Sequence, residues 1–329
     1  MMAAADLDST HRRESIKKKY PVILCRCSSY KKDEVRPALE RFWQLAGGIH
    51  SFIRPSDRVL IKPNLIIPAD VSKPAQTHPS VITELARLIQ EVGGKPAVGD
   101  SPAWGNVRSC LKTLEIDTVL ESMGVEIVQL NKAVRVCIDG ARVGISRAAL
   151  ESDVIINVPK FKAHQQLGAT FAVKNMFGCV VGKEKPVWHF LRGGQPSAFC
   201  RLLLGIYRHL APAITLIDGI VAMEGQGPTS GSAKPLGLLI GGQDPIACEY
   251  ACCRLIGLNP STLPILQTAS MIGYGCPSVE QITVVGDPLP EEPCPDSKFA
   301  RQTPLRFTLP RICKSVTKQA MLLIKNRLR

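Results

Sequence analysis

The chain has 329 residues, of which 45% are hydrophobic and 21% charged, so it can bury a full core and is typical of a globular rather than a disordered protein. Its net charge of +13 comes mostly from the ends: residues 298–329 hold nine Lys and Arg and no Asp or Glu, and the first twenty residues add +2. The body between them carries only +2, which argues against a nucleic-acid channel through it.

Apolar residues in short runs and at helical spacing predict strands that alternate with helices. Gly and Pro mark the boundaries: Pro79 suits a first helical position, and Gly93-Gly94 ends the same helix. The elements predicted in the first half are a strand over Tyr20–Cys27, a helix over Glu34–Ala46, a strand over Val59–Ile61, a helix from Pro79 to Val92, a strand at Ala97–Val98, a helix over Val107–Met123 and a strand over Val125–Leu130.

The same alternation continues in the second half, where Asp244 is a typical helix N-cap followed by Pro245. The elements predicted there are strands over Val154–Val158, Ile214–Ile217, Leu236–Ile240 and Ile282–Val285, with helices from Pro245 to Gly257 and over Thr262–Met271. Buried strands alternating with helices predict an α/β fold with a mainly parallel sheet flanked by helices. The Gly-punctuated residues 165–192 are expected to form a small inserted subdomain or lid.

Composition divides the chain into three parts. Residues 1–19 are predicted to be a mobile basic segment, residues 20–290 one α/β domain, and residues 291–329 a Pro-rich linker and a basic tail. In the tail, apolar residues alternate with basic ones, a pattern typical of an amphipathic helix that touches an anionic membrane surface. A solvated helix docked on the body fits this pattern equally well. We expect no specific nucleic-acid partner.

Cysteine usage and hydropathy indicate the compartment. The twelve cysteines include no CxxC pair and no zinc or ferredoxin spacing, so we interpret them as reduced thiols in a reducing compartment. No apolar run reaches the 18 or more residues of a membrane-spanning helix, and the N-terminus has no apolar region typical of a secretory signal. A cytoplasmic protein is therefore expected.

Polar side chains follow one predicted strand after another. In open α/β sheets ligands bind beyond the carboxyl ends of the strands, so residues at these points are expected to share one site. Lys62 and Asn64 follow the second strand and Asp100 follows the third. If the strand that begins at Val154 stays extended, alternation places Lys160, Lys162 and His164 on one side of it, which suits a phosphate or carboxylate.

Further candidates extend this site. His78 occupies an N-cap position where Ser, Thr, Asp or Asn is usual, so we predict proton transfer by His78 or His164, with a structural role for His78 as the alternative. Lys160, Lys162 and Asp100 complete the predicted catalytic group. The additional predicted substrate-binding residues are Lys174, Asn175, Lys183 and His189, together with Gly225 and Gly227, whose backbone N–H groups could line an anion-binding concavity.

Four carboxylates are predicted to bind a divalent metal or to orient the bases. Oxygen ligands of this kind suit Mg²⁺ or Mn²⁺. The four are Asp218, Glu224, Asp244 and Glu249. For Asp244 the role of helix cap is the equal alternative. Cys248, Cys252 and Cys253 share a predicted helix with Glu249, and core packing is the favoured interpretation for them.

As an ordered set these strings resemble a prokaryotic family known as domain-of-unknown-function family 362. The matching strings are Lys62-Pro63-Asn64, Thr77-His78-Pro79, Gly99-Asp100-Ser101, Asn157-Val158-Pro159-Lys160-Phe161-Lys162-Ala163-His164, Lys174-Asn175-Met176-Phe177-Gly178, Asp218-Gly219, Glu224-Gly225-Gln226-Gly227-Pro228, Asp244-Pro245 with Glu249, and Gly273-Tyr274-Gly275. The resemblance covers roughly residues 20–290 and implies that the polar strings belong to one site. Family members are often associated with ferredoxin-type iron–sulfur modules, but this chain lacks their cysteine clusters, so we expect no such cluster in it.

Three functional hypotheses follow. The first is an enzyme acting on a small anionic metabolite, with an unidentified cofactor or a divalent metal. The second is a redox-associated protein that works with a separate ferredoxin. The third is a non-enzymatic protein that binds a membrane surface or nucleic acid through its basic tail.

Overall fold

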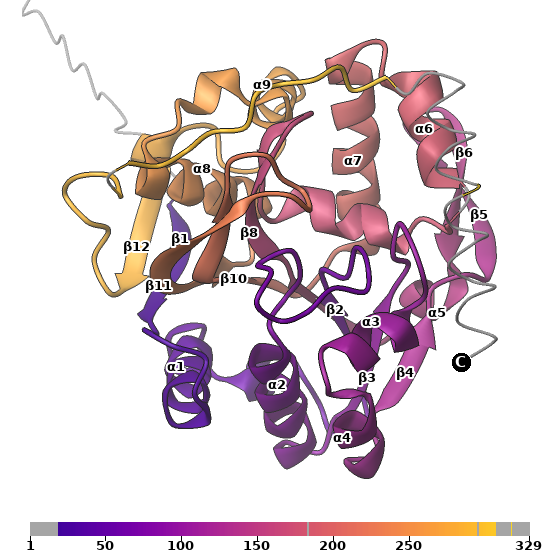
Figure 1. Cartoon of the computed structure of the whole chain (residues 1–329), viewed down its shortest axis with the longest axis vertical. Helices are drawn as coiled ribbons and strands as arrows, with labels where there is room; N and C mark the ends of the chain where they lie inside the picture. Colours follow the sequence, from indigo (N-terminus) through magenta and orange to yellow (C-terminus); the bar gives the residue numbers. More distant parts are fainter. Residues whose placement is uncertain (1–18, 183, 295, 307–316, 318–329) are drawn as a thin grey trace, which may run out of the picture.

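The fold is that of a computed structural model, which describes residues 19–182, 184–294, 296–306 and Thr317. Ten of its strands form one sheet (Figure 1). These strands are β1 (Tyr20–Arg26), β2 (Arg58–Pro63), β3 (Lys95–Asp100), β4 (Glu126–Gln129), β7 (Val154–Val158), β8 (Lys160–His164), β9 (Gly168–Thr170), β10 (Ile214–Glu224), β11 (Ser232–Gly242) and β12 (Ile282–Gly286).

Most neighbours in this sheet run parallel, which confirms the predicted fold class. Eight strands follow the order β12-β1-β11-β10-β7-β2-β3-β4, and β8 pairs with both β10 and β9. Only β11 against β1 and β10, and β9 against β8, pair antiparallel. Because β1, β10, β7, β2, β3 and β4 all run in one direction, their carboxyl ends meet at one edge of the sheet.

Helices cover both faces of the sheet. The α-helices are α1 (Lys32–Leu45), α2 (Pro79–Glu91), α3 (Val107–Thr113), α4 (Asp117–Ser122), α5 (Arg147–Leu150), α6 (Glu184–Arg192), α7 (Pro196–Leu210), α8 (Pro245–Ile256) and α9 (Pro264–Met271). Short 3₁₀ turns are η1 (Ile49–Ser51), η2 (Val173–Cys179), η3 (Pro260–Thr262) and η4 (Val279–Gln281). Figure 1 shows α1 to α4 on one side of the sheet and α7 to α9 on the other.

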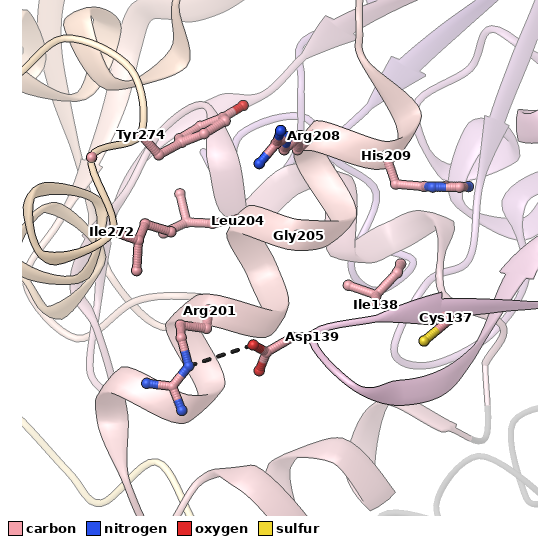
Figure 2. Close-up of a pocket in the computed structure, with 11 residues that line it drawn as sticks. Cys137, Ile138, Asp139, Arg201, Leu204, Gly205, Arg208, His209, Ile272 and Tyr274 are labelled. Atoms are coloured by element: carbon pink, nitrogen blue, oxygen red, sulfur yellow. Dashed lines mark ion pairs between the residues drawn. The ribbon is translucent and has the colours of Figure 1, made fainter.

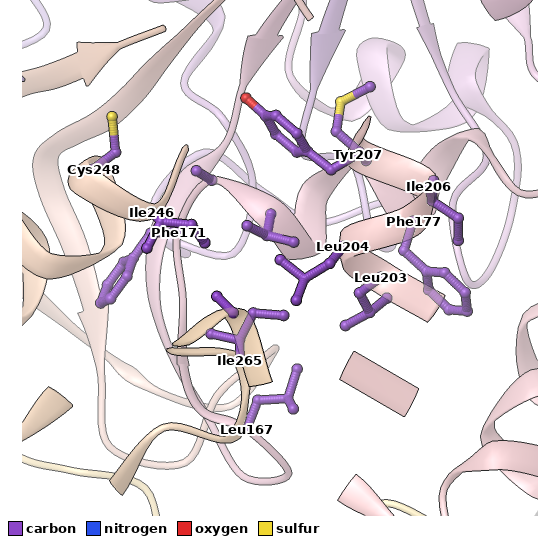
Figure 3. Packing of buried hydrophobic residues seen from close by; sticks show 14 of the residues in the cluster. Leu167, Phe171, Phe177, Leu203, Leu204, Ile206, Tyr207, Ile246, Cys248 and Ile265 are labelled. Carbon is purple, nitrogen blue, oxygen red and sulfur yellow. The ribbon is translucent and has the colours of Figure 1, made fainter. Parts of the chain in front are cut away.

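Each face of the sheet has its own hydrophobic cluster, and alternation along a strand decides which cluster a side chain joins. In β1, Val22 and Leu24 belong to the cluster under α7 and α8, and Ile23 and Cys25 to the cluster under α1 and α2. Figure 3 shows part of the first cluster, with Tyr207 and its neighbours on α7 in view. The sheet is therefore buried on both sides, as expected for parallel strands.

Two predicted boundaries differ from the structure. The single helix predicted over Val107–Met123 is two helices, because Glu115 has a positive φ of 58° that interrupts helical geometry between α3 and α4. A hairpin of β5 (Ala133–Ile138) and β6 (Ala141–Ser146) forms a sheet of its own that the sequence patterns did not predict. Its strand β5 alternates between exposed and half-buried residues, so little apolar contrast marks it.

Residues 165–192 contain β9, η2 and α6. The side chains of Met176 and Phe177 in η2 are buried within the cluster that also holds α7, so this part of the segment belongs to the core. Beyond the predicted linker the chain returns to the body: Thr303 N–H donates to the Gln165 carbonyl at 2.7 Å, and Leu305 is buried. Residues 1–18 and most of the basic tail lie outside the described residues.

The cysteines are free thiols throughout the described chain. Eleven are described, and all but Cys137 and Cys294 are buried. Cys248, Cys252 and Cys253 lie in the core under α8, which confirms the packing role predicted for them. Burial raises the pKa of Cys25 and Cys27 to about 11, so these thiols stay protonated at neutral pH.

Candidate functional site

One cavity of about 110 Å³ lies at the carboxyl-end edge of the parallel strands, where β2, β3 and β7 end. It gathers residues from as far apart in the chain as Asn64 and Pro228. Its polar lining residues are Asn64, Asp100, Ser101, Lys160, Lys162, His164, Thr170, Lys174, Asn175 and Lys185. The location is the one predicted for ligand binding in this class of fold.

A buried ion pair joins Asp100, which lines the cavity, to Lys62, which lies behind it. Lys62 Nζ lies 2.9 Å from Asp100 Oδ1, and the two side chains are 0% and 3% exposed. Asp100 also accepts the backbone N–H groups of Leu65 and Ser101, at 2.8 and 2.7 Å. A Cβ atom on Gly178 would lie 2.4 Å from Asp100 Oδ1 and 2.7 Å from Lys62 Nζ, so only glycine leaves room for the pair.

Lys162 is held by two oxygen acceptors. Its Nζ donates to Asn64 Oδ1 at 2.5 Å and to the Ala75 carbonyl at 2.9 Å. The Asn64 amide donates to Asn175 Oδ1 at 3.1 Å, and Asn175 donates to Asn157 Oδ1 at 2.8 Å. This chain of amides links the loop after β2 to η2 and to β7, and thereby fixes the position of the Lys162 ammonium at the cavity.

A second buried ion pair involves Lys160. Its Nζ donates to Asp218 Oδ2 at 2.8 Å and to the Tyr30 hydroxyl at 2.6 Å, and that hydroxyl donates to Asp218 Oδ1 at 2.7 Å. The His78 ring stacks on Tyr30 at 3.5 Å, and its Nδ1 accepts the Ser80 N–H as the cap of α2. Burial lowers the pKa of His78 to about 4, so it is neutral at pH 7. His78 lies behind Lys160 and does not line the cavity.

The cavity and its wall carry an excess of positive charge. Five lysines gather here, with Asp100 and Asp218 as the carboxylates that pair with two of them. Burial and the neighbouring ammonium groups lower the pKa of Lys162 to about 7, and burial lowers the pKa of Lys174 and of Lys185 to about 8. Burial also lowers the pKa of Lys160, against the opposing effect of Asp218. Among the described residues, Lys162, Lys174 and Lys185 have no carboxylate partner, in contrast to Lys62 and Lys160.

Glu249 supports the site from behind. It is 1% exposed, and its Oε1 accepts the backbone N–H groups of Ala172 and Val173, each at 3.0 Å. These two residues directly precede Lys174 at the start of η2, so Glu249 positions the segment that carries this lysine. Burial raises the pKa of Glu249 from its ordinary value of 4.5 to about 7, despite the opposing effect of the two N–H groups.

This raised pKa predicts a pH-dependent stability. The folded protein binds the Glu249 proton more tightly than the unfolded chain does, so its stabilising effect is complete below pH 4.5 and is lost as the pH rises through 7. Glu249→Gln keeps the Oε1 acceptor and never ionises, so we expect it to be more stable than wild type at pH 8, by up to about 3 kcal/mol. Urea unfolding between pH 4.5 and 8 measures the difference.

The exposed Glu126→Gln variant is the control, because it makes the same substitution at a surface carboxylate. A Glu249→Gln variant that is less stable than wild type at pH 8 would contradict the assignment.

The four carboxylates predicted to bind a metal do not form one site. Asp218 pairs with Lys160, and Asp244 caps α8 by accepting the Ala247 N–H at 2.8 Å. Glu224 accepts the Lys298 N–H at 3.0 Å, and Glu249 lies beneath η2. Among the described residues, no three His, Cys, Asp or Glu side chains come together in a way that could hold a metal ion. Sequence position alone could not show that each carboxylate has a separate local partner.

The remaining predicted residues separate into two groups. His164 lines the cavity, and its Nδ1 accepts the Gln166 N–H at 3.1 Å. His189 is instead packed in the core, with its ring 4.4 Å from that of Phe199. Gly225 and Gly227 form a turn beside β8: a Cβ on Gly227 would lie 1.9 Å from the Ala163 carbonyl, so this glycine permits close backbone approach. Lys183 lies outside the described residues.

Sequence reasoning missed Tyr30, and it considered Lys185 as a further donor but left it out of the predicted binding residues. Tyr30 follows β1, whose carboxyl end reaches the same edge of the sheet, so the rule that found Lys62 and Asp100 would also have found it. Lys185 lies on α6, and its ammonium donates to the Ser101 carbonyl across the cavity. Because α6 does not directly follow a strand of the sheet, the sequence could not predict that it lies beside the cavity.

A larger groove of about 590 Å³ lies between α7, the β5–β6 turn and the loop after α9 (Figure 2). Its charged groups are surface groups: Arg208, His209 and Asp139 are exposed. Asp139 pairs with Arg201 at 3.5 Å and with the neighbouring Arg192 at 2.8 Å. Exposed charges of this kind interact weakly through solvent. None of the predicted site residues lines it, so the lysine cavity remains the candidate functional site.

Comparison with known proteins places the chain in a family. Residues 59–254 match the family described as Domain of unknown function (DUF362). The chain belongs to this family. Over 304 residues it is 34% identical to the thylakoid-associated protein sll1697 of Synechocystis sp.. The aligned region covers 90% of this chain and 93% of that protein.

Among solved structures, the lactate racemase apoprotein of Thermoanaerobacterium thermosaccharolyticum matches this DUF362 chain with a TM-score of 0.46 and 14% identity. The match covers 71% of this chain and 57% of that one. Within the described residues of the DUF362 protein, no helix has both the length and the apolar content needed to cross a membrane.

Proposed function

We propose that the protein is an enzyme that binds a small metabolite through one or two phosphate or carboxylate groups in the lysine cavity. The observation that carries the proposal is the set of four lysines that line the cavity, with a fifth paired directly behind it. Buried ammonium groups in excess over carboxylates are costly unless a negative ligand joins them. A bound anion would supply the missing charge, and the same groups could stabilise negative charge that develops during a reaction.

The size of the cavity limits the ligand. A volume of 110 Å³ has room for roughly four water molecules, since each takes a share of about 30 Å³ in the liquid. This space suits a metabolite of a few carbon atoms and is too small to enclose a nucleotide. Leu65, Phe171 and Phe177 supply apolar wall beside the charged groups, as in other small-molecule sites.

Lys185→Gln tests the proposal without removing a buried ion pair, because Lys185 is half-buried and donates its hydrogen bond to the neutral Ser101 carbonyl. We expect wild type to bind oxalate or inorganic phosphate saturably, and the variant to bind about 10–150-fold more weakly. This range corresponds to one lost charge-assisted hydrogen bond of about 1.5–3 kcal/mol. Isothermal titration calorimetry at fixed ionic strength measures both affinities.

The matched control is Lys95→Gln. Lys95 is exposed at the amino end of β3, on the opposite edge of the sheet from Asp100, so its removal changes net charge equally without touching the cavity. Equal losses of affinity in the two variants would indicate general charge attraction, and the absence of saturable binding to wild type would refute the proposal.

The cytoplasmic location and the partners predicted from the sequence belong to the same proposal. A small anionic molecule is the partner that the cavity supports. Contact of the basic tail with an anionic membrane surface, and work with a separate ferredoxin, remain predictions from the sequence.

A further inference from the structure

The five lysines at the site differ in what their ammonium groups contact. Lys62 and Lys160 are each paired with a carboxylate, and Lys162 donates to two oxygens. Lys185 donates to a carbonyl. Within the described part of the chain, Lys174 Nζ makes no hydrogen bond or ion pair; it lies over the face of the Phe177 ring, 5.4 Å from the centroid, and within electrostatic reach of Cys200. Of the five lysines, Lys174 is therefore the one whose ammonium donates no hydrogen bond to an oxygen acceptor in the described structure.

Resting on the proposed function, we propose that Lys174 forms a covalent imine with the keto or aldehyde carbon of the anionic ligand, and that the ligand is a small oxo acid. Three features of the site meet the needs of this reaction. The amine is free of a carboxylate partner, it faces a cavity of metabolite size, and other lysines line that cavity to hold the acid group of the ligand. Lysines desolvated beside other cations are the ones that react with carbonyl substrates.

The amine must lose a proton before it can attack. Burial lowers the pKa of Lys174 to about 8, so about a tenth of it is neutral at pH 7, far more than for an ordinary lysine of pKa 10.5. Lys185 has a similarly lowered pKa of about 8 and lies within electrostatic reach of Lys174. Both lysines line the same cavity, so we assign to Lys185 the transfer of this proton.

The step balances without another reagent. Lys174 Nζ forms a bond to the carbonyl carbon while the C=O π bond breaks, and the oxygen takes the proton that Lys185 holds. A proton of the attacking nitrogen then joins the hydroxyl, which leaves as water as the C=N bond forms. One ammonium and one carbonyl compound thus become one protonated imine and one water. The positive imine can then accept electrons from a bond broken next to it.

Glu249 acts in this scheme as a positioning residue. Its carboxyl holds the N–H groups of Ala172 and Val173 and so fixes the start of the 3₁₀ turn that carries Lys174. It contacts neither the cavity nor the lysine ammonium in the described structure.

Reduction with borohydride tests the inference directly, because it converts an imine into a stable amine. Full-length protein is incubated with pyruvate at pH 7.5, reduced, digested and analysed by peptide mass spectrometry. We expect an adduct on Lys174 whose added mass equals that of pyruvic acid less one oxygen atom. Oxalate, which fills the anion site but has no keto group, should prevent the labelling. Lys95 reports the background labelling of an exposed lysine.

Lys174→Arg keeps the positive charge but cannot form the imine, and Lys174→Met is a second variant in case the larger side chain disturbs the cavity. Both should lose the adduct, and the Arg variant should still bind oxalate. Wild type that binds oxalate but gives no adduct, an adduct mainly on another cavity lysine, or equal labelling of Lys95 would overturn the inference and leave the proposed function standing. Failure of wild type to bind oxalate would overturn both.

Discussion

Asp100→Asn is expected to destabilise the protein by about 3–5 kcal/mol, because it leaves Lys62 buried without its counter-charge. Lys62 is fully buried, and the Asn side chain can offer it only a neutral oxygen. In the wild type the Leu65 N–H donates to Oδ2 and the Ser101 N–H to Oδ1, so the single oxygen of Asn also removes one backbone acceptor. Urea unfolding followed by circular dichroism gives the free energy of unfolding.

A double variant separates charge from packing. Lys62→Met combined with Asp100→Asn removes both charges, so it should be more stable than Asp100→Asn alone. Asp33→Asn, an exposed aspartate at the start of α1, serves as the control and should change stability by less than about 1 kcal/mol. A loss of less than about 1 kcal/mol in Asp100→Asn itself would show that the pair is not needed for folding.

Oxalate binding is expected to weaken steeply as the pH rises from 6.5 to 9. In the free protein the pKa of Lys162 is lowered to about 7 and those of Lys174 and Lys185 to about 8. A bound dianion favours the charged lysines and raises these pKa values, so binding takes up protons. Affinity is then highest below pH 7 and falls about tenfold per pH unit for each proton taken up.

Oxalate suits this measurement because both of its carboxyls stay ionised over the whole range. Calorimetry in two buffers that differ in ionisation enthalpy gives the number of protons directly. Lys185→Gln should take up fewer protons than wild type, and Lys95→Gln the same number. An affinity that stays constant from pH 6.5 to 9 would contradict the assigned lysine ionisation.

Much of the fold and part of the site could be predicted from the sequence, because they depend on local patterns. Short apolar runs identified the strands of the parallel sheet, and the rule for strand ends brought Lys62, Asp100 and Lys160 to one edge. Alternation in β8 also placed Lys162 and His164 at the same cavity. The β5–β6 hairpin was not predicted, because residues of β5 alternate between exposed and half-buried positions and so show little apolar contrast.

The partners of these side chains could not be predicted, because they come from distant segments. Nothing near Lys160 in the sequence indicates that Asp218 and Tyr30 hold its ammonium group. Lys62 and Lys160 therefore look like ligand-binding cations in the sequence but are largely neutralised within the protein. Glu224 and Asp244 likewise look like metal ligands until their contacts with backbone N–H groups are known.

The amide chain that runs from Asn64 through Asn175 to Asn157 has a consequence for selectivity. It anchors the Lys162 ammonium to strands buried on both faces, so this charge keeps one position whether or not a ligand is present. A preorganised binding site gains affinity because no group has to be reordered on binding. It cannot, however, adjust to a ligand whose charged ends are a different distance apart. The protein should therefore rank linear dicarboxylates by the distance between their charged ends rather than by their total charge.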